Sequence, residues 1–212
     1  METLLESAVG QTASLPEPTR EGAHSLEAAL AKRRSRRHYE DRPLTLEQVS
    51  QLLWAAQGQT DPRGRRAAPS AGGCYPLELD VVSAQGVLRY LPDAHALRKR
   101  LEGDLRVECA QACSGQMFMA AAPVTFCFSA VYERTTGRYG ERGVRYVHMD
   151  AGIAAENLHL QAEALGLGSV AIGAFNDDEV ARVLGLPAAE KPLYLVPVGY
   201  VQARRPDAAR DS

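Results

Sequence analysis

Apolar residues recur at the spacing of an amphipathic helix in the segment between Thr45 and Gly58. The repeating positions are Leu46, Val49, Leu52, Leu53 and Ala56. Thr45 and Gln48 form a capping-box pattern, in which each side chain accepts a hydrogen bond from the backbone N–H of the other residue. We therefore predict a helix that begins after Thr45, ends at Gly58 and buries one face, with Trp54 on or near that face.

Short apolar runs bounded by turn residues predict strands. The first two are joined by a turn at Gln85-Gly86, and the third is apolar enough to lie in the middle of a sheet. The predicted strands cover residues 77–84, 87–91, 123–131, 169–173 and 193–200.

Helical periodicity returns between these strands. Helices are predicted over residues 25–34, over 95–121 with interruptions near Gly103 and Gly115, over 145–165, and after the capping residue Asn176. Strands and helices in this mixed order predict an α+β domain.

The helix predicted over 145–165 has a stretch almost free of large side chains. It contains Ala151, Gly152, Ala154 and Ala155. Small residues allow another backbone to approach closely, either the protein's own sheet or a second copy in a two-fold dimer. The sequence leaves both possibilities open.

The chain has 212 residues, which fits one domain with a substantial core. Residues 1–24 contain Pro16, Pro18 and Gly22 and little apolar periodicity, so we expect a flexible N-terminal lead-in. The domain itself is expected over 25–205, followed by a C-terminal tail over 206–212.

Charge is nearly balanced, with 24 basic and 26 acidic residues and a net charge of −2. Nucleic-acid binders usually carry a broad basic surface, so no nucleic-acid partner is expected. No apolar run approaches the ~20 residues of a membrane helix, and residues 1–6 lack the basic and apolar parts of a signal peptide. We expect a cytoplasmic protein with no membrane partner.

No metal-binding or nucleophile motif stands out. The four cysteines, at positions 74, 109, 113 and 127, lack zinc-site or redox-motif spacing, so free thiols are expected. His148 and His159 are separated by roughly three helical turns and are expected to be surface or packing residues. No metal is predicted.

A dense basic cluster follows the first predicted helix, with Arg33, Arg34, Arg36 and Arg37 around Ser35. The planar guanidinium group donates two parallel hydrogen bonds and suits phosphate. The cluster could hold an anion or could be a solvated helix end. A non-catalytic reading makes it a patch for docking nucleic acid or a protein partner.

Two loops are rich in small residues and leave their backbone N–H groups unobstructed. They are Ala67-Ala-Pro-Ser-Ala-Gly-Gly73 and Ala171-Ile-Gly-Ala-Phe175, and the pair Arg204-Arg205 follows the last predicted strand. Such parts suit a flat ligand that bears a phosphate and is held mainly by main-chain groups.

In their order along the chain, these parts resemble the FMN-dependent nitroreductase superfamily. The Pro-Ser-Ala-Gly-Gly-x-Tyr-Pro form of one segment is similar in particular to the SagB-like branch, which includes oxidases that form thiazoles and oxazoles. The matching segments cover residues 33–39, 68–78, 150–157, 165–174 and 197–200.

The resemblance implies a nitroreductase-like α+β fold, with a mainly antiparallel sheet flanked by helices. It also implies an intertwined homodimer with FMN at the subunit interface. Arg33, Arg34, Ser35 and Arg37 would bind the FMN phosphate and ring edge, and Arg204 and Arg205 would complete the phosphate site. Residues from the partner subunit would contact the ribityl chain and ring, namely Pro69, Ser70, Ala71 and Gly72.

By the same resemblance, Ile172, Gly173 and Ala174 would line the ring, with the Gly173 amide donating to flavin N5. The expected activity is two-electron transfer from NADH or NADPH to a small organic acceptor, such as a nitro compound or a quinone. The flavin supplies the chemistry and the protein supplies position and electric field.

Two positions depart from the pattern. Residues 171–173 lack the Glu that many family members carry there. The azole-forming members have Lys-Tyr where this chain has Arg138-Tyr139, and Arg is a poor general base because it stays protonated. Tyr139 remains available as an acid or an orienting group, so oxidation of an azoline in a heterocyclised peptide is the second enzymatic hypothesis.

Overall fold

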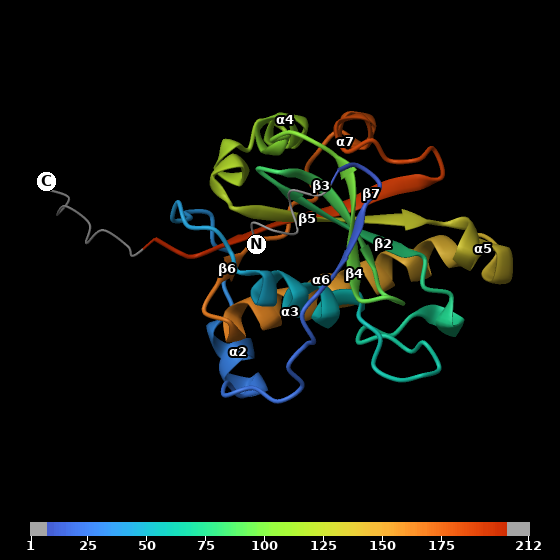
Figure 1. Ribbon diagram of the computed structural model, residues 1–212. Coiled ribbons are helices and arrows are strands. Elements are labelled where there is room, and N and C mark those ends of the chain that lie inside the picture. Colours follow the sequence, from blue (N-terminus) through green and yellow to red (C-terminus); the bar gives the residue numbers. More distant parts are fainter. Residues whose placement is uncertain (1–7, 203–212) are drawn as a thin grey trace, which may run out of the picture.

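The computed structural model describes residues 8–202 as a seven-stranded sheet with helices on both faces (Figure 1). The strand order is β1-β4-β3-β2-β5-β7-β6, and every pair of named strands is antiparallel. The strands are β1 (Thr12–Ser14), β2 (Leu77–Ser83), β3 (Gly86–Leu91), β4 (Ala96–Leu101), β5 (Val124–Val131), β6 (Gly168–Ser169) and β7 (Glu190–Gly199). The predicted α+β class and antiparallel sheet are confirmed.

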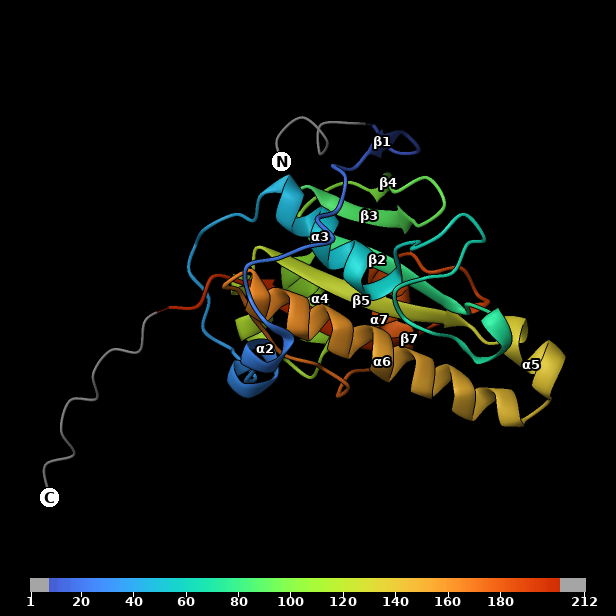
Figure 2. The same ribbon diagram turned by 90° about the horizontal axis from the view of Figure 1, so that it is seen from below.

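The helices form two layers. In Figure 1, α3 and α6 cover one face of the sheet, and α4 and α7 cover the other. Figure 2 shows α6 running the length of the sheet beside α3. The helices are α2 (Leu26–Lys32), α3 (Leu46–Gln57), α4 (Arg106–Ala112), α5 (Glu133–Tyr139), α6 (Arg142–Ala164) and α7 (Asp177–Val183), with 3-10 turns η1 (Ala71–Gly73) and η2 (Met117–Ala121).

The two faces of the sheet have separate hydrophobic cores. One lies under α3 and α6 and includes Phe126, Phe128 and Leu158, while the other lies under α4 and α7 and includes Cys127, Val180 and Leu195. β5 contributes to both cores because its side chains alternate between the faces. This explains why its sequence is apolar at almost every position.

Several local predictions are confirmed. Thr45 and Gln48 make both hydrogen bonds of the capping box at the start of α3, and Gly58 ends that helix. Asn176 caps α7 by accepting from Glu179 N at 3.0 Å. Trp54 is half-buried, and its Nε1–H donates to Gln59 O at 3.1 Å.

The segment 95–121 is not helical throughout, because Ala96–Leu101 forms strand β4. A turn at 92–95, with His95 at a φ of 43°, returns the chain alongside β3, where Tyr90 pairs with Leu97. Tertiary pairing therefore overrides the helical tendency of this basic stretch.

Part of the expected flexible lead-in belongs to the sheet. β1 pairs with β4 and forms one edge of the sheet, and Gly10 N donates to Lys99 O at 2.8 Å. Leu15 is buried in the core. Three strand residues are too few to produce a readable periodicity, which is why the pattern gave no sign of this strand.

Other boundaries also differ from the prediction. The strand expected over 169–173 is shorter, with β6 at Gly168–Ser169 and an isolated bridge between Ile172 and Leu195. The helix expected from residue 145 begins at Arg142 and is preceded by α5, which the sequence analysis did not predict.

The described cysteines have free thiols, as expected, with Cys74 half-buried and the other three buried. No group of His, Cys, Asp or Glu within residues 8–202 could hold a metal ion. No helix in the same part of the chain is long and apolar enough to cross a membrane.

A buried ionic network joins the strands on the face covered by α4 and α7. The Arg89 guanidinium donates to both carboxylate oxygens of Asp80 at 2.8 Å and to those of Glu190 at 3.1 and 2.7 Å. Asp80 is fully buried, and Glu190 is 7% exposed. Both carboxylates would lack their main partner without Arg89.

Replacing Arg89 by Ala should lower the free energy of unfolding by about 3–5 kcal/mol, because Glu190 loses its counter-charge and Asp80 keeps only the ion pair with Arg100 at 3.0 Å. Urea unfolding followed by circular dichroism measures this. Arg65→Ala is the control, because Arg65 pairs with Asp61 in solvent with 68% of its side chain exposed. A loss for Arg89→Ala no larger than that of the control would contradict the structural role of the network.

Candidate functional site

The basic cluster lies on an extended segment after α2 that is attached to β6. Ser35 forms a parallel bridge with Ser169, and Arg36 N donates to Ser169 O at 2.9 Å. Gly168 allows this close approach, since a Cβ there would overlap Val201 and would lie 2.7 Å from Arg36 Cβ. The backbone junction fixes where the neighbouring arginines project.

Three residues of the cluster share one cavity. Arg33, Ser35 and Arg37 line a space of about 300 Å³, which is near the lower end of the range for ligand sites. The remaining lining residues come from α6, the segment after β6, and β7, and they are Gly152, Ala155, Glu156, His159, Val170, Ala171 and Tyr194.

The cavity carries more positive than negative charge. Arg33 Nε lies 3.7 Å from Glu156 Oε1, with both side chains partly exposed, so this pair is weak. Arg37 makes no ion pair within residues 8–202, and its guanidinium carbon lies 6.0 Å from the centre of the Phe118 ring. The arrangement suits an anionic ligand.

His159 is the buried titratable group of this cavity. Its Nδ1 lies 2.7 Å from Ser169 Oγ, and the residue is only 7% exposed. Burial, together with the nearby charge of Arg33, lowers the pKa of His159 to about 4. The imidazole is therefore neutral near pH 7.

The remaining predicted residues of the basic cluster and of the loop after β6 do not line this cavity. Arg34 turns back and donates from Nη1 to Arg33 O at 2.7 Å and to Ala31 O at 3.1 Å, so it does not line the cavity. Ile172 points into the core and exchanges backbone hydrogen bonds with Leu195. Gly173 and Ala174 are exposed at the end of this segment.

The loop with Pro69, Ser70, Ala71 and Gly72 is fixed on α6 and does not line the cavity. Ser70 Oγ donates to Asp150 Oδ2 at 2.6 Å and accepts from Tyr75 N at 2.9 Å, while Ala71 N donates to Asp150 Oδ1 at 3.4 Å. Burial raises the pKa of Asp150 against the opposing effect of these hydrogen bonds. The loop is thus preformed within one chain.

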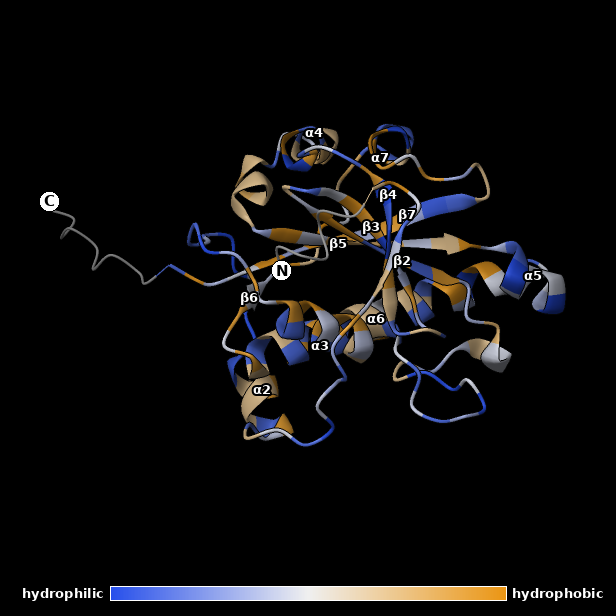
Figure 3. Ribbon diagram, in the orientation of Figure 1, coloured by the Kyte–Doolittle hydropathy of each residue, from blue (hydrophilic) through white to orange (hydrophobic). Residues whose placement is uncertain are grey.

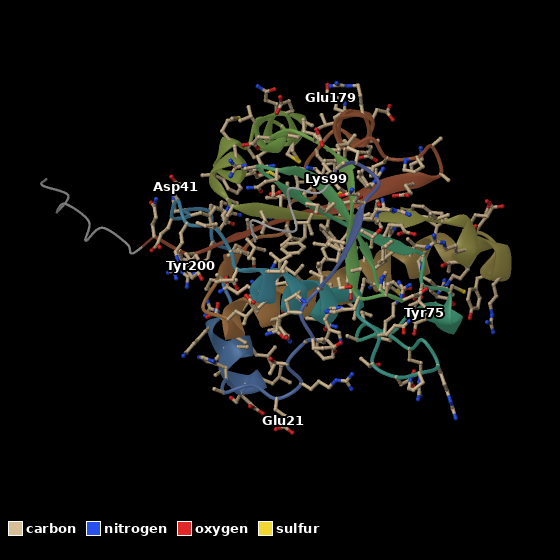
Figure 4. The ribbon with its side chains drawn as sticks, viewed as in Figure 1. Glu21, Asp41, Tyr75, Lys99, Glu179 and Tyr200 are labelled. Atoms are coloured by element: carbon tan, nitrogen blue, oxygen red, sulfur yellow. The ribbon has the colours of Figure 1, made fainter. Side chains whose placement is uncertain are left out.

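Tyr139 lies on α5 against the same loop. Arg138 Nη1 donates to Gly72 O at 3.2 Å, and a Cβ on Gly72 would overlap Tyr139 Oη. Figure 4 shows Tyr75, near the end of this loop, and Tyr200, just after β7, on opposite sides of the molecule. Neither Tyr139 nor a residue of this loop lines the cavity beside β6 in the same chain.

Arg204 and Arg205 lie outside the described residues.

Sequence analysis missed the contribution of α6 to the cavity. Gly152, Ala155, Glu156 and His159 have the spacing of one helix face, and this periodicity was the available signal. The sequence analysis compared His159 only with His148, which is exposed and lies 2.6 Å from Tyr132 Oη. In the structure, the hydrogen-bond partner of His159 is Ser169, and the spacing of residues along the sequence could not identify this pair.

The small residues of α6 serve mainly the protein's own core. Ala151, Ala154 and Ala155 are buried against the sheet, whereas Gly152 is exposed beside the cavity. Larger apolar side chains remain exposed on α2 and α6, and Figure 3 shows apolar residues on α2. They are Leu26, Leu30, Val144, Met149 and Ile153.

A larger cavity of about 640 Å³ lies between residues 19–26, α3 and α6. It includes none of the arginines of the basic cluster after α2. The smaller cavity is the stronger candidate site because two arginines of the basic cluster, the hydroxyl-bearing Ser35 and the buried His159 converge on it.

Three comparisons with known proteins all point to the nitroreductase family. The model of the nitroreductase family matches residues 30–200. A protein of Methanocaldococcus jannaschii whose name places it among the nitroreductases, MJ1384, is 48% identical over 82% of this chain and 90% of its own length. A solved structure from Ralstonia eutropha JMP134, described as that of a nitroreductase, has a TM-score of 0.83 and 32% identity, covering 91% of this chain and 90% of the other.

Two more distant relatives have more specific names. The FMN reductase [NAD(P)H] of Bacillus subtilis is 27% identical over 81% of this chain and 64% of its own length. The microcin B17-processing protein McbC of Escherichia coli is 24% identical over 68% of this chain and 57% of its own length.

Acid should destabilise the fold through His159. The unfolded imidazole has a pKa near 6.5 and the folded one about 4, so the unfolded state binds the proton first as the pH falls. We expect the free energy of unfolding to fall between pH 6.5 and 4 by up to ~1.4 kcal/mol per pH unit. Urea unfolding at several pH values measures it. His159→Gln should flatten the dependence and His148→Gln should not; equal slopes in all three proteins would contradict the assignment.

Proposed function

The chain belongs to the nitroreductase family and is an FMN-dependent oxidoreductase, and we propose that it transfers electron pairs from NADH or NADPH to a small organic acceptor at the cavity beside β6. The observation that carries the proposal is the convergence of Arg33, Ser35 and Arg37 on one cavity. Nitro compounds and quinones are the proposed class of acceptor.

The residues present fit FMN. Arg33 and Arg37 supply guanidinium donors for the phosphate or an anionic ring edge, and Ser35 supplies a hydroxyl. Ala171 presents a small side chain to the cavity, which leaves room for a flat ring. We propose Arg204 and Arg205 as further phosphate contacts, with Arg34 left at the rim because it is engaged with its own helix end.

Bound FMN supplies two-electron transfer, with hydride accepted and released at N5 of its ring. The Gly173 N–H makes no hydrogen bond within residues 8–202 and is exposed, so it is free to donate to a ligand. Arg37, without an acidic partner in that part of the chain, holds positive charge beside the site. No protein nucleophile is required for this chemistry.

A second copy of the chain would complete the site. Pro69, Ser70, Ala71 and Gly72 form a loop that is ordered on α6 but does not line the cavity of its own chain. Exposed apolar residues on α2 and α6 include Leu26, Leu30 and Ile153. A homodimer that buried these side chains would bring the loop of one subunit to the cavity of the other.

Replacing Arg37 by Ala should weaken FMN binding by roughly 10- to 150-fold, because one charge-assisted hydrogen bond of about 1.5–3 kcal/mol is lost. Quenching of FMN fluorescence on titration measures this. Arg36→Ala is the matched control, because Arg36 neighbours the same residues but does not line the cavity. Equal affinity in wild-type and Arg37→Ala protein would overturn the phosphate assignment, and a wild-type protein that binds no FMN would overturn the function.

Azoline oxidation is a second candidate function, favoured by the position of Tyr139. Its hydroxyl lies against Gly72, in the loop proposed to face the flavin of the partner subunit, and Arg138 is held on the same glycine. Tyr139 could orient a substrate or donate a proton, while Arg138 could serve only as a cation.

The azoline hypothesis predicts the loss of two mass units per ring when FMN-loaded protein acts on a heterocyclised peptide. Mass spectrometry detects this, and Tyr139→Phe should slow it. An unchanged peptide mass, in a preparation that reduces a quinone with NADH or NADPH, would exclude this function and leave the first proposal intact.

A further inference from the structure

We propose that His159 binds the cofactor directly, as a neutral hydrogen-bond donor placed between α6 and the basic cluster. The inference rests on the proposed function, since it concerns the occupant of the same cavity. Its ligand would be an oxygen of FMN, either on the phosphate or at the edge of the ring.

The position of His159 connects it to the residues already assigned. It lines the cavity with Arg33, Ser35 and Arg37, although it comes from α6 and they come from the segment after α2. Ser169 connects the two sides, because its hydroxyl meets His159 Nδ1 at 2.7 Å and its backbone bridges to Ser35. The imidazole is thus held relative to the backbone that carries the basic cluster.

One ring nitrogen remains for a ligand. Nδ1 is occupied by Ser169, whereas Nε2 makes no hydrogen bond within residues 8–202. In that part of the chain, Thr135 Oγ1 is the one side-chain polar atom that is both fully buried and unpartnered. Nε2 has no partner in this part of the chain and is not among the fully buried unpartnered atoms, so it remains accessible, and His159 lines the cavity.

The charges around the ring favour a donor at Nε2. Arg33 and Arg37 make the cavity attractive to an oxygen that accepts hydrogen bonds, and Glu156 is the acidic residue among the lining side chains. We assign the Ser169 hydroxyl as the donor to Nδ1, which places the proton of the neutral ring on Nε2, where it can be donated to the same class of ligand atom. A neutral ring adds a donor without adding a third positive charge.

Affinity measurements on matched variants test this assignment. His159→Leu should weaken FMN binding about tenfold, the loss expected for one hydrogen bond to a charged acceptor. His159→Gln, which can still donate from its amide, should recover part of the affinity. His148→Gln, a change on the same helix away from the cavity, should have no effect.

Riboflavin distinguishes the two kinds of oxygen because it lacks the phosphate. If His159 donates to the phosphate, His159→Leu should weaken binding of FMN but not of riboflavin. If it donates to the ring edge, both ligands should be weakened equally. Equal FMN affinity of wild-type and folded His159→Leu protein would overturn the inference, whereas a wild-type protein without FMN affinity would overturn the proposed function itself.

Nitrogen NMR of the wild-type protein gives a test that needs no variant to fold. In ¹⁵N-histidine-labelled protein, His159 should show the Nε2–H tautomer near pH 7. Addition of FMN should shift its Nε2–H signal and leave that of His148 in place. A proton on Nδ1, or a His159 signal unmoved by saturating FMN, would contradict the proposed hydrogen bond.

Discussion

The backbone of Ser169 is the junction on which the candidate site depends. It pairs with Val198 of β7, accepts a hydrogen bond from Arg36 N and carries the hydroxyl next to His159. The sheet, the basic segment and α6 therefore meet at one short strand. Gly168 makes the meeting possible, since a side chain there would displace Arg36 and Val201. A cluster that could have been a solvated helix end is thereby given a fixed geometry.

The long helix α6 positions both parts of the proposed site. Near its middle, Asp150 holds the loop at Ser70, and further along, Glu156 and His159 line the cavity with Arg33. The loop and the cavity belong to one chain but do not meet around one ligand. The proposed second copy, docked on the exposed apolar side chains of α2 and α6, would explain why the loop and the cavity are each ordered within one chain but do not meet there.

Much of the fold was predictable because its signals are local. The capping box at Thr45, the apolar run of β5 and the cap at Asn176 each depend on neighbouring residues, and each prediction is confirmed. β4 was missed because its pairing with β3 overrides the tendency of a basic segment to form a helix. His159 was missed as a residue that lines the cavity because its partner, Ser169, is brought to it only by the fold.

The central claim is that the cavity of one subunit and the Ser70 loop of the other form one FMN site. A mixed dimer tests it most directly, made from an Arg37→Ala subunit and a Gly72→Val subunit whose loop is forced away from Tyr139, with different affinity tags. Each variant alone should bind FMN poorly, whereas the purified mixed dimer should contain one intact site and bind about one FMN per dimer. If the mixed dimer binds FMN no better than its parents, each site lies within a single chain and the account is contradicted.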